Sequence, residues 1–321
     1  MRHLRLISDN PNIDFFKPMR FWLAISALGV LLTLVLVPLR GLNYGVDFLG
    51  GTLILAEFSE HRDIGEYREA LDSLGLGEVA VTEASGGSGG QVVLMRIGNS
   101  ADSASTQAEV VPKVQEKLNA TFPGAKYLQV DNVGGKVSGE LVYTGVLAVA
   151  LALLAIMAYV WLRFEWQFAL GAVISLLHDV IVTIGVFSLL QLQFDLTIVA
   201  ALLTIIGFSI NDTVVVFDRV RENLRKYKKM PLKEVMNLAL NETLSRTFMT
   251  VFTVLIALAS LLFFGGPVVF GFAFATIFGV VIGTYSSIWV ASAIVLWLGV
   301  KRDWATKGES KAGTQFGAGK A

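Results

Sequence analysis

The sequence contains no cysteine and few charged residues. In a chain of 321 residues, Asp, Glu, Lys and Arg make up only 16%, whereas soluble domains carry roughly 25%. The lack of cysteine excludes disulfides, thiol catalysis and metal sites built on Cys ligands. The 26 basic residues balance the 26 acidic ones, so there is no basic excess of the kind that binds nucleic acid. With 54% hydrophobic residues, the composition is that of a membrane protein.

The apolar segments predict six transmembrane helices, since about 20 apolar residues cross a bilayer. The uncharged run 247–300 is too long for one span, and the Gly265-Gly266-Pro267 sequence divides it. The predicted spans are 21–39, 141–162, 166–190, 196–217, 247–264 and 276–299, with an exterior loop at 265–275. A secretory signal in place of the first span is disfavoured because no A-x-A cleavage site follows it.

Lys and Arg gather in alternate short segments. Residues 1–20 carry four, 218–246 carry eight and 301–321 carry five, whereas 191–195 and 265–275 carry none. Because basic loops stay in the cytoplasm, both termini (1–20 and 300–321) are expected there, in a multi-pass protein of the bacterial inner membrane. The segment 40–140 is then exterior, or periplasmic.

The basic connection 218–246 is expected to be helical and amphipathic. Pro231 can open a second helix that lies on the membrane surface. This helix is either a cytoplasmic anchor or a contact for a partner.

The exterior segment 40–140 alternates between strand and helix patterns. Strands are predicted at 52–58, 79–85, 91–98 and 125–133, and helices at 62–74 and about 103–121. The order βαββαβ predicts a ferredoxin-like α+β domain, with two helices on one face of an antiparallel sheet. The GGSGG sequence (86–90) is interpreted as a hairpin, not a nucleotide cradle, because no helix opens after it. The domain has no catalytic triad, phosphate loop or metal-spaced ligands, so we expect a binding or lever module and no enzyme.

Two acids lie inside predicted spans, where an ionisable side chain is costly and is therefore a candidate for function. Asp212 lies six residues inside the boundary at Asp218, or about 9 Å deep. Asp179 lies 14 residues beyond Glu165, or about 20 Å deep, so a direct pair of the two carboxylates is not expected. Arg246, at the mouth of the fifth span, can extend its guanidinium toward Asp212.

Two interpretations of this arrangement remain open. Asp212 and Arg246 form either a static buried pair that fixes helix register or a pair whose separation switches proton affinity. Ser209, Asn211 and Thr213 supply hydrogen-bonding groups near Asp212. His178 and Asp179 either pin neighbouring helices or carry protons.

Four long motifs resemble the SecF branch of the SecD/SecF family of bacterial protein-export membrane proteins. They are GLNYGVDFLGGT (41–52), SLLHDVIVTIGVFSLL (175–190), DLTIVAALLTIIGFSINDTVVVFDRVREN (195–223) and NETLSRTFMTVF (241–252). In plan the family is similar to one half of a resistance–nodulation–division transporter. The resemblance covers nearly all of residues 20–300.

The resemblance implies a partner, SecD, which supplies six further spans. It also implies that the pair uses the proton-motive force to draw unfolded preproteins through the SecYEG channel, with YajC as a further partner and no cofactor besides protons. In this family the acid of the SINDT motif and the arginine of the LSRT motif are linked to proton conduction, and they fall on Asp212 and Arg246.

The GVDFLGG motif lies at the junction of the first span and the exterior domain. Its glycines Gly45, Gly50 and Gly51 offer backbone freedom beside Asp47, which is where a hinge would bend.

Two other functions compete with protein export. A proton-driven exporter of small apolar molecules belongs to the same superfamily, but exporters of that kind have much larger exterior domains. A passive assembly factor for SecD would tolerate neutralisation of Asp212.

Overall fold

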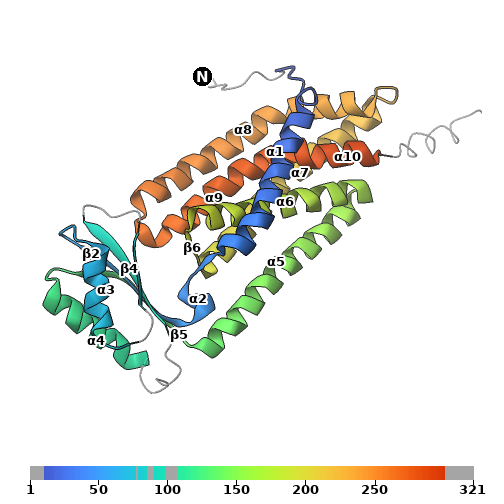
Figure 1. Cartoon of the computed structure of the whole chain (residues 1–321). Coiled ribbons are helices and arrows are strands. Elements are labelled where there is room, and N and C mark those ends of the chain that lie inside the picture. Colours follow the sequence, from blue (N-terminus) through green and yellow to red (C-terminus); the bar gives the residue numbers. More distant parts are fainter. Residues whose placement is uncertain (1–10, 77–78, 85–89, 99–106, 301–321) are drawn as a thin grey trace, which may run out of the picture.

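The computed structural model describes residues 11–76, 79–84, 90–98 and 107–300. A bundle of long helices carries a small α/β domain at one end (Figure 1). Most of the GGSGG sequence and the terminal segments 1–10 and 301–321 lie outside the described residues.

The described residues include six long apolar helices, which confirms the prediction of six spans. Each has the length and hydropathy needed to cross a bilayer, and α6 has the bounds expected from the sequence. The helices are α1 (Met19–Arg40), α5 (Gly135–Arg163), α6 (Trp166–Leu190), α7 (Leu196–Lys226), α8 (Leu232–Phe264) and α9 (Pro267–Ser286), the last continued by a π-helical turn (Ser287–Ala291) into α10 (Ser292–Leu298).

The structure corrects the prediction for the connection 218–246. There is no separate surface helix, because α7 continues to Lys226 and α8 runs without a break from Leu232 to Phe264. Pro231 does precede a helix, but that helix is the fifth span itself, since no glycine or proline interrupts the sequence between Pro231 and Gly265. Helices of this length exceed a bilayer and project beyond it.

The expected exterior loop 265–275 is also wrong. The α9 helix begins at Pro267, where a proline fits the first helical turn without losing a hydrogen bond. The chain reverses at Gly266, whose φ of 75° favours glycine. Only Gly265 and Gly266 separate the last two spans.

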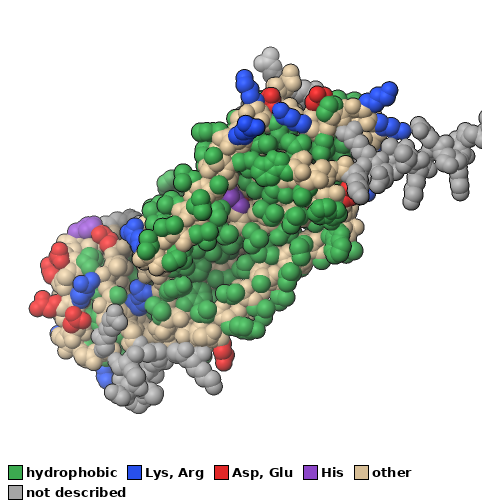
Figure 2. Space-filling model, turned by 45° about the vertical axis from the view of Figure 1, so that its right-hand side comes forward, with side chains coloured by type: hydrophobic (Ala, Val, Ile, Leu, Met, Phe, Trp, Pro, Cys, Tyr) green, Lys and Arg blue, Asp and Glu red, His purple; other side chains and the backbone are tan. Residues whose placement is uncertain are grey.

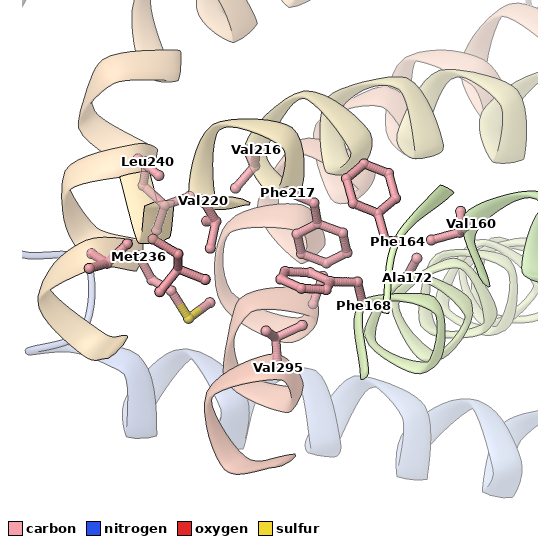
Figure 3. Close-up of a cluster of buried hydrophobic side chains, with 14 of the residues drawn as sticks. Val160, Phe164, Phe168, Ala172, Val216, Phe217, Val220, Met236, Leu240 and Val295 are labelled. Carbon is pink, nitrogen blue, oxygen red and sulfur yellow. The ribbon is translucent and has the colours of Figure 1, made fainter. Parts of the chain in front are cut away.

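An aromatic and aliphatic cluster joins the helices at the end far from the α/β domain (Figure 3). The Phe168 and Phe217 rings meet edge to face, with centroids 4.9 Å apart, and Met236 and Leu240 of α8 are fully or almost fully buried in the same cluster. Burial of this apolar surface fixes the ends of α6, α7, α8 and α10 to one another.

The α/β domain follows α1. Its elements are β2 (Gly51–Phe58), α3 (Ile64–Asp72), β3 (Val79–Glu83), β4 (Gln91–Ile97), α4 (Gln107–Thr121) and β5 (Lys126–Val133). The sheet has the strand order β3-β4-β2-β5, and all its pairs are antiparallel. This is the βαββαβ order that the sequence predicts.

Alternate residues of the strands divide into two cores. Residues such as Ile54 and Met95 pack under α3 and α4, against Tyr67 and Leu118. Leu53, Leu55 and Val92 point to the other face, as the period of two in a strand requires. There they pack against Val46 of the short helix α2 (Val46–Leu49), which places this face next to the junction with the bundle.

A short parallel pairing ties the junction to the bundle. Strand β1 (Asn43–Tyr44) pairs with β6 (Gln193–Phe194), which lies between α6 and α7, with Asn43 opposite Gln193. The guanidinium of Arg96 in β4 donates to the Tyr44 carbonyl and to Asn43 Oδ1. The base of the domain is thereby linked to the start of α7.

Close packing of α7 and α9 depends on Gly279, and this can be tested with two alanine variants. A Cβ at Gly279 would lie 2.3 Å from Cγ1 and Cδ1 of Ile205, whereas one at Gly207 would meet nothing within 4 Å. We expect Gly279→Ala to destabilise the protein by about 1–3 kcal/mol. Gly207→Ala should be neutral or stabilising by up to about 1 kcal/mol. Equal thermal unfolding midpoints of the two variants in detergent micelles would contradict this packing.

Candidate functional site

The middle of the bundle contains a group of buried polar side chains. They lie on α6, α7, α9 and the π-helical turn after α9, which pack together between the more exposed helices α1, α5 and α8. Its members are Ser175, His178, Asp179, Thr183, Ser209, Asp212, Thr213, Ser286 and Ser287, all less than 9% exposed. In an apolar layer such groups are costly unless they bond to each other, so their pairing is informative.

Asp212 lies on α7 and is 3% exposed. Its Oδ2 atom is fully buried and accepts no hydrogen bond from the described residues. An ionised carboxylate in this position lacks the compensation that burial demands. Asp212 is therefore the least satisfied polar group of the site.

Arg246 lies on the neighbouring helix α8, on a side of that helix that this chain leaves exposed. Its charge acts on Asp212 electrostatically, but within the described residues the two side chains form no direct ion pair. In this conformation the acid and the arginine are near each other without being joined.

The three polar residues next to Asp212 in the sequence have different surroundings. Ser209 donates to Asp179 Oδ2 at 2.7 Å. Thr213 shares a hydrogen bond of 2.7 Å with Ser287 and donates to the Ser209 carbonyl. Asn211 is exposed on the opposite side of α7. None of their side chains bonds to Asp212 in the described part of the chain.

Asp179 is completely buried on α6. Its Oδ1 lies 3.0 Å from Nδ1 of His178, and its Oδ2 accepts from Ser209 of α7 and, at 2.9 Å, from Ser286 of α9. Ser286 also bonds to Ser175 at 2.9 Å. Asp179 is thus held from three helices, and it has no direct contact with Asp212 among these bonds.

The junction motif is built on close backbone contacts. Gly50 and Gly51 have φ of 75° and 117°, and a Cβ at Gly51 would lie 2.4 Å from the Ile97 carbonyl oxygen. Gly45 donates its N–H to the Phe194 carbonyl at 2.8 Å. These glycines are required here for packing and backbone conformation.

Asp47 connects the motif to α7. Its Oδ2 accepts the N–H of Leu196 at 2.9 Å, and Asp195 caps the same helix through Thr197 and Ile198. Burial raises the pKa of the Asp195 carboxyl, and the negative charge of Asp47 raises it further. Two acids therefore meet at the positive end of the α7 dipole.

The sequence did not reveal Ser175, Ser286 and Ser287 as partners in this site. Ser and Thr are common in apolar helices, where they bond to the carbonyl four residues earlier, as Ser287 does to Gly283. Arg219 and Asn223 of α7, which both donate to Glu242 of α8, were missed as well. Their spacing in a basic, helical segment carries no signal of a contact between helices.

Comparison with known proteins gives consistent matches. Residues 113–301 match the family "Protein export membrane protein SecD/SecF, C-terminal", and residues 35–60 match the "SecD/SecF GG Motif". "Protein translocase subunit SecF" of Cereibacter sphaeroides is 54% identical, with 98% of this chain and 97% of the relative covered. The protein of the same name from Ketogulonicigenium vulgare is 50% identical, with the same two coverages.

Two solved structures of SecDF have the same fold. The SecDF described as a translocon-associated membrane protein, from Thermus thermophilus, is 35% identical with a TM-score of 0.81, and 91% of this chain is covered. SecDF in a super-membrane-facing form is 32% identical with a TM-score of 0.63 over 94% of this chain. This chain spans only 39% and 40% of those two chains.

Proposed function

Because the chain belongs to the SecD/SecF family of protein-export membrane proteins, we propose that it works as the SecF subunit of the Sec export machinery. It is a membrane transport component and not an enzyme. With SecD, it uses the proton-motive force to promote the passage of unfolded preproteins through SecYEG, with YajC as a further partner. The observation that carries the proton-coupled part is Asp212, a carboxylate buried in a span, one oxygen of which has no hydrogen-bond partner among the described residues.

The coupling follows from the two charge states of Asp212. A protonated Asp212 is neutral and can stay buried without a cation. An ionised Asp212 needs a positive neighbour, and Arg246 on α8 is free to supply it by a movement of its long side chain or of the helix. One charge that crosses the membrane gains about 2.3 kcal/mol per 100 mV, enough to drive such a change.

The exposed faces of the bundle support the pairing with SecD. The outward side of α7 carries a stripe of small or short polar residues, Ala200, Thr204, Gly207 and Asn211. Small residues allow close contact between membrane helices. SecD helices on this stripe, and beside the exposed Arg246, would complete the proton site.

The distribution of charge supports the orientation. Lys and Arg gather at the end of the bundle opposite the α/β domain (Figure 2). By the positive-inside rule this end is cytoplasmic, and the α/β domain is in the periplasm.

The exterior domain acts as the moving part. A cavity of about 280 Å³ lies between the face of its sheet that is opposite α3 and α4 and the ends of α7 and α9, lined by Leu55, Leu94, Asp131 and Phe270 among others. This space, and the few residues of the β1–β6 link, allow the domain to change its angle to the bundle. The passive assembly factor remains as an outcome of the tests below.

Neutralising Asp212 tests the proton role. Asp212→Asn keeps the size and hydrogen bonding of the side chain but removes the titratable group. We expect gradient-dependent export into inverted membrane vesicles to be abolished while SecD association is kept. Asp218→Asn is the matched control, because Asp218 is on the same helix in an exposed ion pair with Arg163 and should matter little. Undiminished gradient dependence in Asp212→Asn would argue for the passive assembly factor.

Removing both charges distinguishes a switch from a static pair. Arg246→Met leaves an ionised Asp212 without a nearby cation, and adding Asp212→Asn should restore stability because it removes that uncompensated buried charge. A switch predicts that the double variant is stable yet inactive in gradient-dependent export. Wild-type export by the double variant would show that the pair is structural.

Locking the junction tests the moving domain. Asn43 and Gln193 are directly opposed, and neighbouring strands are about 4.8 Å apart, within the Cα range of a disulfide of roughly 4.4–6.8 Å. In this chain without cysteine, Asn43→Cys with Gln193→Cys forms a unique cross-link. We expect export to stop on oxidation and to return on reduction, whereas Asn43→Cys alone stays active. Full export by the oxidised protein would show that this movement is dispensable.

A further inference from the structure

The carboxylate of Asp179 lies in a cage formed by three helices. His178 of α6 contacts Oδ1, while Ser209 of α7 and Ser286 of α9 both donate to Oδ2, at distances of 2.7–3.0 Å. The carboxylate is completely buried, and His178 is 7% exposed. A carboxylate and an imidazole in contact inside a membrane span can hold a proton between them.

We propose that His178 and Asp179 form a second proton-binding site, which holds one exchangeable proton and works in series with Asp212. The proposal rests on the proton coupling proposed above. It gives a role to a carboxylate that has neither a direct contact with Arg246 nor one with Asp212.

The charges around the pair determine how many protons it holds. Among the described residues, no Lys or Arg bonds to Asp179, and the imidazole is the one base that touches it. The other groups on α6, α7 and α9 that bond to the network are hydroxyls, and Tyr285 of α9 lies beside His178 with ring centroids 6.2 Å apart. On α7, the titratable residue nearest to Ser209 in the sequence is Asp212, on which the charge of Arg246 of α8 acts.

With one proton the pair is neutral, as either imidazolium and carboxylate or imidazole and carboxylic acid. With no proton it leaves a buried negative charge without a cation, which is unfavourable in the membrane. The proton is therefore released only as another arrives or as a positive charge approaches. This behaviour suits a relay better than a passive contact.

The helix geometry connects the pair to Asp212. Ser209 is three residues before Asp212 on α7, which is about 4.5 Å along the axis. A Cβ at Gly283 of α9 would lie 2.9 Å from Ser209 Cβ, so a glycine there lets Ser209 and Ser286 reach the same oxygen. The π-helical turn Ser287–Ala291 follows at once, and such turns are frequent at functional sites.

Infrared difference spectroscopy distinguishes this site from a static hydrogen-bond network that exchanges no proton. The full chain, purified with SecD and placed in lipid vesicles, is titrated with pH while bands of protonated carboxylic acids and of imidazole are recorded. We expect Asp179→Asn to remove one set of titrating bands and the gradient-stimulated part of export. Asp212→Asn should keep those bands and lose its own.

A milder variant covers the case in which Asp179→Asn does not fold. Ser286→Ala removes one donor from Oδ2 and should shift the frequency of the Asp179 bands, whereas Thr204→Ala, on the exposed side of α7, should leave them in place. The proposal is overturned if Asp179→Asn folds with an unchanged titration spectrum, or if Ser286→Ala moves no band. If Asp212→Asn keeps gradient-dependent export while the Asp179 bands still titrate, the proposed function is rejected instead.

Discussion

The structure depends on how polar groups are satisfied in a layer without water. A buried hydroxyl, imidazole or carboxylate of the bundle is costly unless it bonds to its own helix or to a neighbouring one. Asp179 does so completely, with donors from α7 and α9 and the imidazole of His178. Asp212 does not, since its Oδ2 is buried without a partner in the described part of the chain. One carboxylate thus holds α6, α7 and α9 together, and the other remains available for a change of charge.

Hydrogen bonds between buried side chains on different helices require that these helices approach closely, and glycines provide the space. Gly279 faces Ile205 and Gly283 faces Ser209, both at separations that leave no room for a methyl group. The outer helices are different. In α5 and in α8, only 6% of the apolar 18-residue stretch of the helix is buried within this chain, whereas in α6 the share is 50%. The chain is therefore well packed around α6, α7 and α9, and its outer helices α1, α5 and α8 leave apolar surface exposed for lipid or for further helices.

Much of this architecture could be predicted from the sequence, because hydropathy and alternation are local signals. They predict the six spans and the βαββαβ order, and they place Asp212 inside a span, where the structure shows it to be buried. Two boundaries were predicted wrongly. The helix after Pro231 was expected to end before the fifth span, but it continues through that span to Phe264. Residues 267–275 were expected to form a loop, but they are helical because Pro267 stands where proline starts a helix. The serine cage of Asp179 could not be predicted, since which hydroxyls meet depends on the rotation of each helix and not on its own sequence.

One helix links the proposed proton site to the exterior domain. Helix α7 carries Asp212 and Ser209 in the bundle, and its first N–H groups are bound by Asp47 and Asp195 at the junction. Asp47 belongs to the segment that leads into the sheet, and β1 and β6 join the same two regions. A shift or rotation of α7 that follows a change of charge at Asp212 must therefore either move the GVDFLGG segment or break the bond from Leu196 to Asp47. Because α7 is continuous over Leu196–Lys226, it can transmit such a shift over its length without a hinge of its own. In the proposed mechanism, the short junction outside the membrane is the place where a rigid movement of the helix would become a change in the angle of the domain.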